Sequence, residues 1–286
     1  MIEALQFEFL RNALFAGLLA SLICGVIGSL IVVNRLVFLS GGVAHSAYGG
    51  IGLAFFFGWA YLPCATLFAL AAAMIMAAVS LHMKQRADTI IGVMWAVGMA
   101  IGILLIDFSP GYNVDLMSYL FGSILSVPRS ELMTMTLLGA VILGLIALFY
   151  RDLLLMSYDE EFAQVRGVPV RALYYLLIGC VAVTVVIVVQ VVGLILVIAL
   201  MTIPPSIAEK YTTSLLQMMV LSCLLGMLFI VGGLWGAYQY DLTSGAAIIM
   251  VAAAGFLMSL MVDRGLAVKR RRRWLQAHHQ NAADNT

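Results

Sequence analysis

The chain has 286 residues, of which 64% are hydrophobic and 10% are charged, and its formal net charge is +1. Soluble domains carry roughly 25% charged residues, so this composition excludes an ordinary soluble domain. Apolar runs of about 18 residues or more recur from end to end, each long enough to cross a bilayer as a helix. We therefore expect an all-α, polytopic membrane protein and not a β-barrel, whose short alternating segments the sequence lacks.

Nine apolar segments are predicted to span the membrane. In chain order they are 12–33, 37–58, 61–82, 89–107, 132–149, 172–190, 192–208, 214–236 and 243–262. The pair within 172–208 meets near Gly193 with almost no loop, so a single bent span is the alternative, and it would reduce the total to eight.

The basic residues indicate on which side each loop lies, because cytoplasmic loops collect Lys and Arg. If the C-terminus is inside and the spans alternate, thirteen basic residues face the cytoplasm and only Arg11 and Arg129 lie outside. The sequence therefore predicts that the N-terminus is outside and the C-terminus inside. On this interpretation residues 1–263 form one transmembrane domain with a cytoplasmic loop at 150–171.

A basic tail occupies residues 264–286 and contains the run Lys269–Arg273. We expect it to be a disordered cytoplasmic segment that anchors on anionic lipid headgroups. The sequence assigns no role to His278 and His279.

The chain carries no signature of its own energy source. No acidic residue lies deep in a predicted span, which argues against an ion-driven carrier. Its lysines are Lys84, Lys210 and Lys269, and none follows a GxxxxG pattern, so there is no Walker A loop. An HExxH motif is also absent. We therefore expect a subunit that is not an enzyme and that depends on a partner for energy.

The stretch 40–52 combines glycines with one histidine inside a predicted span. Residues 3, 4, 7 or 8 positions apart lie on one face of a helix. The face that contains Gly41, His45 and Tyr48 would therefore be a groove lined by glycines, with one imidazole and one phenol in it. Neutral imidazole is a common ligand of divalent transition metals, although a lone histidine can equally be a packed helix residue. The residues of this stretch that we single out are Gly41, Gly42, His45, Ser46, Tyr48, Gly49 and Gly52.

The stretch 159–169 is typical of a short polar helix with defined ends. Asp159 is a candidate N-cap, Gly167 fits the left-handed position after the last turn, and Pro169 prevents continuation. Such a helix either lies on the membrane surface or docks a cytosolic subunit. Glu160 and Glu161 make its first turn acidic. Phe162, Val165 and Arg166 share one face, which is apolar with a charged rim.

Pro204 and Pro205 follow one another in the seventh predicted span. Each removes a backbone donor, so we expect either a helix break that acts as a gate near the cytoplasmic side or a simple helix end before Glu209.

Four motifs in fixed order carry a resemblance to a known family. They are Gly41–Gly50, Asp159–Val168, Gly193–Pro205 and Tyr240–Ala246. Together they resemble the permease subunit of the zinc/manganese/iron ABC importers over roughly residues 8–263. The resemblance implies a type II-like importer permease in a bacterial cytoplasmic membrane, with no stably bound cofactor and no nucleic-acid partner.

The resemblance also implies roles and partners. Two permease copies would pair with two cytosolic ATPases that bind ATP and with one extracytoplasmic metal-binding protein. The helix at 159–166 would be the coupling helix, and His45, Ser46 and Tyr48 would line the metal pathway. Many members of the family carry an aspartate four residues before the histidine, and this chain has Gly41 there.

Two other functions remain open at this point. A permease for a metal chelate, such as a siderophore or cobalamin, would use a related fold. A membrane scaffold or channel would have no ATPase partner. The sequence does not distinguish zinc, manganese and ferrous iron, because all three accept imidazole.

Overall fold

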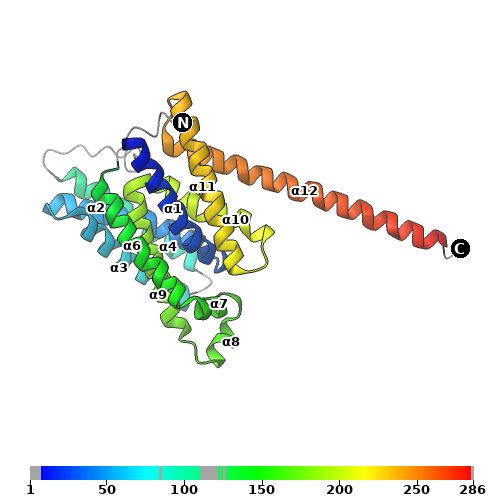
Figure 1. The fold of residues 1–286 in the computed structure, drawn as a ribbon. Coiled ribbons are helices and arrows are strands. Elements are labelled where there is room, and N and C mark those ends of the chain that lie inside the picture. The colour runs from blue at the N-terminus through cyan, green and yellow to red at the C-terminus, as the bar shows by residue number, and fades with distance from the viewer. Residues whose placement is uncertain (1–7, 84–85, 110–121, 123, 125–126, 285–286) are drawn as a thin grey trace.

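The computed structural model describes residues 8–83, 86–109, 122, 124 and 127–284. The regular elements named within these ranges are α-helices. The elements are α1 (Glu8–Val33), α2 (Val37–Phe57), α3 (Tyr61–His82), α4 (Ala87–Asp107), α6 (Arg129–Leu148), α7 (Tyr150–Tyr158), α8 (Glu160–Val165), α9 (Val170–Val192), α10 (Leu194–Tyr211), α11 (Leu215–Tyr240) and α12 (Ser244–Asp284). Figure 1 shows how they pack into a bundle from which the end of α12 projects.

Eight helices are long and apolar enough to cross a membrane, namely α1, α3, α4, α6, α9, α10, α11 and the Ser244–Arg264 part of α12. Helix α2 has a comparable length of 21 residues but is not among these eight. Most of its residues are buried between neighbouring helices, so it needs less apolar surface than a lipid-facing span. The nine segments predicted from the sequence correspond to these eight helices and α2.

The junction between α9 and α10 is a sharp turn and not a bent helix. Gly193 there has φ 85° and ψ 161°, a backbone conformation essentially confined to glycine. Gly122 packs directly against the backbone of Val192 and Gly193. The alternative of one bent span across 172–208 is therefore wrong, because the chain reverses at a glycine and forms two helices.

Helix α9 is the central helix of the bundle. It contacts α1, α2, α3, α6 and α10. On one side of it α2 packs on α3 and α4, and on the other α1 packs on α10 and α11, which in turn contact α12. Because α9 follows α8 in the chain after Pro169, the short helix is joined directly to the element that touches both groups.

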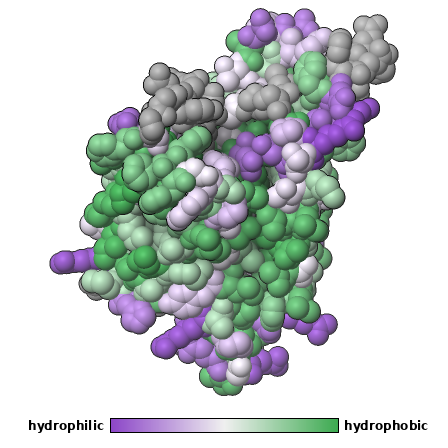
Figure 2. All heavy atoms as spheres, turned by 90° about the vertical axis from the view of Figure 1, so that its left-hand side faces the viewer, coloured by the Kyte–Doolittle hydropathy of each residue, from purple (hydrophilic) through white to green (hydrophobic). Residues whose placement is uncertain are grey.

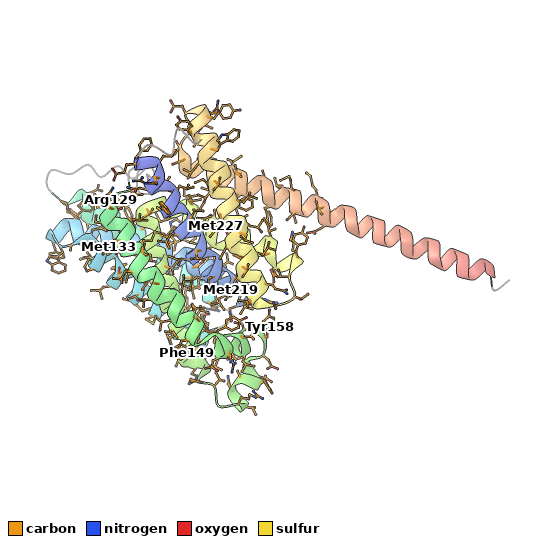
Figure 3. All side chains as sticks on the ribbon, viewed as in Figure 1. Arg129, Met133, Phe149, Tyr158, Met219 and Met227 are labelled. Carbon is orange, nitrogen blue, oxygen red and sulfur yellow. The ribbon has the colours of Figure 1, made fainter. Side chains whose placement is uncertain are left out.

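The two ends of the bundle differ in the residues that they carry. Glu8 at the start of α1 forms an ion pair of 2.6 Å with Arg129 at the start of α6, so both helices begin at the same end. Figure 3 shows Arg129 at that end and Phe149 and Tyr158 at the other. Hydrophobic side chains cover the middle of the molecule in Figure 2, and hydrophilic ones gather toward both its upper and its lower end, the lower being where α7 and α8 lie.

The prolines do not break α10, contrary to the sequence prediction. Pro204 and Pro205 are both buried inside the helix, which continues to Tyr211. The carbonyl that Pro205 leaves without a helical donor belongs to Met201, and this oxygen lies against Gly28 of α1. Tertiary packing thus covers the carbonyl, and the helix can run on.

The helix that precedes the tail continues into it, and disorder of the tail stays a prediction. Helix α12 extends to Asp284, well past the apolar part that ends at Arg264. Lys, Arg, Leu, Gln and Ala are all good helix formers. They follow an existing helix, so no new nucleation step opposes them.

Candidate functional site

The short helix α8 is fixed at its N-terminus by its own sequence. The carboxylate of Asp159 accepts a hydrogen bond of 2.8 Å from the backbone N–H of Phe162. Glu160 and Glu161 occupy the first turn, where the helix dipole favours negative charge. Gln164 donates a side-chain hydrogen bond of 3.2 Å to Glu160. The N-cap predicted at Asp159 is confirmed.

The C-terminus of α8 is closed by a Schellman motif. The N–H of Val168 bonds the carbonyl of Ala163 at 3.0 Å, and the N–H of Gly167 bonds that of Gln164 at 3.0 Å. Gly167 has φ 80°, the left-handed conformation that favours glycine. Both ends of this six-residue helix are therefore specified locally, and it can hold its shape with little support from the bundle.

Two apolar side chains of α8 are exposed among charged and polar ones. Phe162 is 46% exposed and Val165 87% exposed, whereas Ala163 is fully buried against the rest of the chain. The guanidinium of Arg166 lies 5.3 Å from the centroid of the Phe162 ring. The side chains of Phe162 and Val165 lie at a hydrophilic end of the molecule, so lipid does not account for their exposure. We call residues 159–167 the docking helix.

A polar cavity lies behind the docking helix. Its volume is 680 Å³, and its walls include Arg35, Asp88, Glu160, Gln164 and Tyr174. Tyr174 of α9 donates a hydrogen bond of 3.2 Å to Ser80 of α3. No sequence pattern predicts this cavity, because its walls come from separate helix ends that only the fold brings together.

The glycines of α2 mostly serve close packing. A Cβ atom built on Gly52 would lie 2.5 Å from the carbonyl oxygen of Gly102 in α4, and one on Gly98 would lie 2.8 Å from the Cα atom of Ser46. Gly42 packs similarly against Ile91. The glycine groove expected on α2 is therefore filled by α4 and, at Gly49, also by Phe68 of α3. Gly98 and Gly102, one turn apart on α4, provide the other half of the contact between α2 and α4.

Gly41 is the exception on this helix. A Cβ built there meets no atom of the described residues within 4 Å. It lies one turn before His45 on the same face, so the structure leaves free space beside the imidazole.

His45 is half-buried between α2 and α4. Its ring is stacked on the indole of Trp95, with centroids 4.1 Å apart and an interplanar angle of 13°. Its Nδ1 atom is buried and has no hydrogen-bond partner among the described residues. A buried polar atom in this state is a candidate for a ligand or a water molecule. Trp95 was missed by the sequence reasoning, because no local pattern links it to α2.

The other two predicted pathway residues are engaged in packing. The hydroxyl of Ser46 donates to the carbonyl of Gly42 at 2.7 Å and lies 3.3 Å from that of Met94. Tyr48 is 2% exposed and its ring lies against Gly102. Of the three, His45 is the one that keeps a buried polar atom unused.

A resident metal centre does not fit these residues. Across the described part of the chain, no three His, Cys, Asp or Glu side chains come together as a metal site. Structural zinc sites use four ligands, and catalytic ones three. His45 alone can offer a moving cation one imidazole nitrogen, which suits a transient contact.

The fold is a polytopic helical bundle with the short capped helix α8 at one end and His45 between two close-packed helices. The comparison with known families identifies the class of protein. A model of the ABC 3 transport family matches residues 6–263, so the chain belongs to that family, whose members are transport permeases.

Relatives and solved structures match nearly the full length. An uncharacterized membrane protein of Synechocystis sp., slr2045, is 52% identical, covering 92% of this chain and 94% of that protein. The manganese transport system membrane protein MntC of Halalkalibacterium halodurans is 32% identical over 90% and 88%. The structure of PsaBC from Streptococcus pneumoniae in complex with Fab has a TM-score of 0.82 and 33% identity, covering 90% and 93% of the two chains.

Proposed function

We propose that the chain is the membrane-spanning subunit of an ATP-driven importer for a divalent transition-metal ion: manganese, zinc or ferrous iron. Manganese is favoured, because several similar proteins are named as manganese transport proteins. In the working complex, two copies of the chain pair with cytosolic ATPases and an extracytoplasmic metal-binding protein. The complex lies in the bacterial cytoplasmic membrane with the docking helix and the C-terminus inside.

The observation that carries this function is the docking helix. Its two caps make it a rigid unit, and it presents Phe162 and Val165 to solvent. The chain itself has no nucleotide-binding loop. Two apolar side chains with a charged rim, on a rigid helix at a hydrophilic end, suit the binding of an ATPase.

The fold suggests how an ATPase would drive transport. A displacement of α8 passes to α9 through the short connection at Pro169, and α9 contacts both the α2–α3–α4 group and α1 and α10. Movement of α9 can therefore change how the two groups pack, which would open the His45 region to one side of the membrane and then to the other. His45 serves as a transient contact for the ion.

The test is co-purification with a cytosolic ABC ATPase of the same organism. We expect Phe162→Asp and Val165→Asp to abolish ATPase binding, because each places a carboxylate in an apolar contact. Leu242→Asp is the matched control, since Leu242 is an exposed apolar residue in the turn between α11 and α12, away from the docking helix. Retention of the ATPase by both α8 variants would overturn the proposal, as would equal loss in the control.

The same preparation separates the two alternatives. Stimulation of ATPase activity by the binding protein loaded with a bare metal ion supports the importer of ions. Stimulation only by a siderophore or a cobalamin would indicate a chelate permease. Failure to bind any ATPase would indicate a scaffold or a channel.

A further inference from the structure

We propose that Trp95 is a positioning residue for the metal contact at His45: its indole holds the imidazole in one orientation, with Nδ1 withheld from the helix backbone and available to the ion. This inference rests on the proposed function. It adds a residue on a second helix, α4, to a contact that the sequence placed on α2 alone.

The ring geometry is the first support. His45 and Trp95 lie face to face at 4.1 Å and 13°. Phe38 of α2 contacts the same indole at a centroid distance of 6.2 Å and 49°. The indole is therefore held between two aromatic groups of α2, and its position is set by the packing of α2 on α4.

The helix positions one turn before the two rings are open. Gly41 has no described atom within 4 Å of a built Cβ, and Gly92 has only the Phe38 ring at 3.9 Å. Because positions three and four residues apart share a face of a helix, this open space lies on the same helix faces as His45 and Trp95.

A second histidine of the chain shows what the stack prevents. The Nδ1 atom of His82, at the end of α3, lies 2.7 Å from the carbonyl oxygen of Ala78 four residues earlier, which satisfies it within its own helix. The equivalent carbonyl for His45 belongs to Gly41, yet Nδ1 of His45 has no partner among the described residues. Rotation of the imidazole toward that carbonyl would break the parallel stack on Trp95. The stack thus keeps one nitrogen unsatisfied.

Transport kinetics of the reconstituted whole complex test the role. An aromatic pair contributes about 0.5–1.5 kcal/mol, so loss of the stack should raise KM for Mn²⁺ about two- to ten-fold in Trp95→Ala. Vmax and ATPase binding should stay near wild type, because the docking helix is untouched. Trp95→Phe should restore most of the affinity. Trp59→Ala is the control, since Trp59 stacks on Phe57 at the far end of α2.

Fluorescence gives an independent readout. The chain has 4 tryptophans, so replacing Trp59, Trp235 and Trp274 by phenylalanine leaves Trp95 as its one indole. In a complex whose other subunits carry no tryptophan, paramagnetic Mn²⁺ bound at His45 should quench this indole. Adding His45→Ala should remove the quenching. A diamagnetic ion such as Mg²⁺ serves as the control for nonspecific effects.

The outcomes are separable. An unchanged KM in Trp95→Ala, or quenching that persists without His45, overturns the positioning role of Trp95. Metal uptake by the wild-type complex would in that case still support the importer function. If Trp95→Ala does not accumulate, Trp95→Phe and the quenching experiment decide. Absence of metal uptake by the wild-type complex would instead overturn the proposed function itself.

Discussion

Gly28 of α1 lies directly against the backbone carbonyl of Met201, the acceptor that Pro205 leaves without its helical donor. A Cβ built on Gly28 would lie 2.5 Å from that oxygen and 2.9 Å from the ring of Pro205. The close approach allows a Cα–H contact with the oxygen and shields it from lipid. Pro205 is therefore accommodated in α10 because α1 has no side chain at this position.

Replacement of Gly28 by alanine should destabilise the protein. The methyl group would meet backbone, which cannot move as a flexible side chain can, and overpacking of this kind costs about 1–3 kcal/mol. Gly144→Ala is the matched control, because a Cβ there meets no described atom within 4 Å. Thermal unfolding in detergent, followed by gel filtration, measures both. An equal stability of the two variants would contradict the close contact between α1 and α10.

Two glycines of α2 should respond in opposite ways. Gly52→Ala would press on the backbone of Gly102 and should lower stability by about 1–3 kcal/mol or prevent accumulation in the membrane. Gly41→Ala should be tolerated, since its side chain enters open space. Expression level and melting temperature distinguish the two. Similar losses in both variants would mean that α2 and α4 are not packed as described.

The left-handed glycine after α8 should matter for ATPase binding and little for the membrane bundle. Gly167→Ala places a Cβ at φ 80°, which costs about 1–2 kcal/mol and should loosen a helix of six residues. We expect weaker ATPase binding with unchanged thermal stability of the bundle. Gly167→Asn should retain more binding, because asparagine tolerates this conformation. If alanine and asparagine behave as glycine does, the cap is not required.

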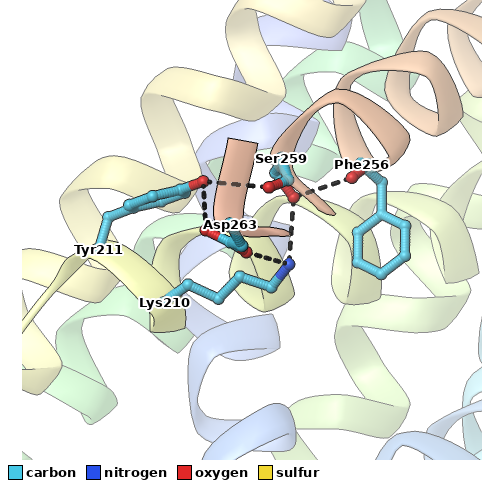
Figure 4. A network of polar contacts seen from close by, with 5 residues as sticks. All are labelled: Lys210, Tyr211, Phe256, Ser259 and Asp263. Carbon is cyan, nitrogen blue, oxygen red and sulfur yellow. Dashed lines mark hydrogen bonds and ion pairs between the residues drawn. The ribbon is translucent and has the colours of Figure 1, made fainter. Parts of the chain in front are cut away.

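A polar network at the end of α10 should couple this helix to α12. Lys210 Nζ lies 3.0 Å from Asp263 and donates to Ser259 at 3.2 Å, and the Tyr211 hydroxyl lies 3.0 Å from Asp263 (Figure 4). Lys210 also lies 5.2 Å from the centroid of the Phe256 ring.

A double-mutant cycle with Lys210→Met and Asp263→Asn should give a larger coupling in thermal stability than Glu8→Gln with Arg129→Met. The side chains of the first pair are 27% and 35% exposed, against 58% and 73% for Glu8 and Arg129. Exposed pairs contribute little, and salt screens them. Equal couplings for the two pairs would show that burial of the Lys210 network has no effect.

The docking helix could be predicted closely from the sequence because its determinants are local. Asp159 bonds a backbone group three residues away, and Gly167 closes the helix with carbonyls of the last turn. The prediction of a break at Pro204 and Pro205 was wrong because the continuity of α10 depends on contacts with another helix. It treated α10 as an isolated helix, whereas the freed carbonyl of Met201 is covered by another helix.

The sequence by itself determined the membrane-spanning class, the nine long helical segments and both caps of α8, because hydropathy, chain length and capping depend on neighbouring residues. Tertiary structure alone decided that Trp95 stacks on His45, that α4 fills most of the α2 groove, and that Gly41 stays open. Those features depend on which helix faces come together. Small residues on many helices permit close approach, so the pairing emerges only from packing of the whole bundle.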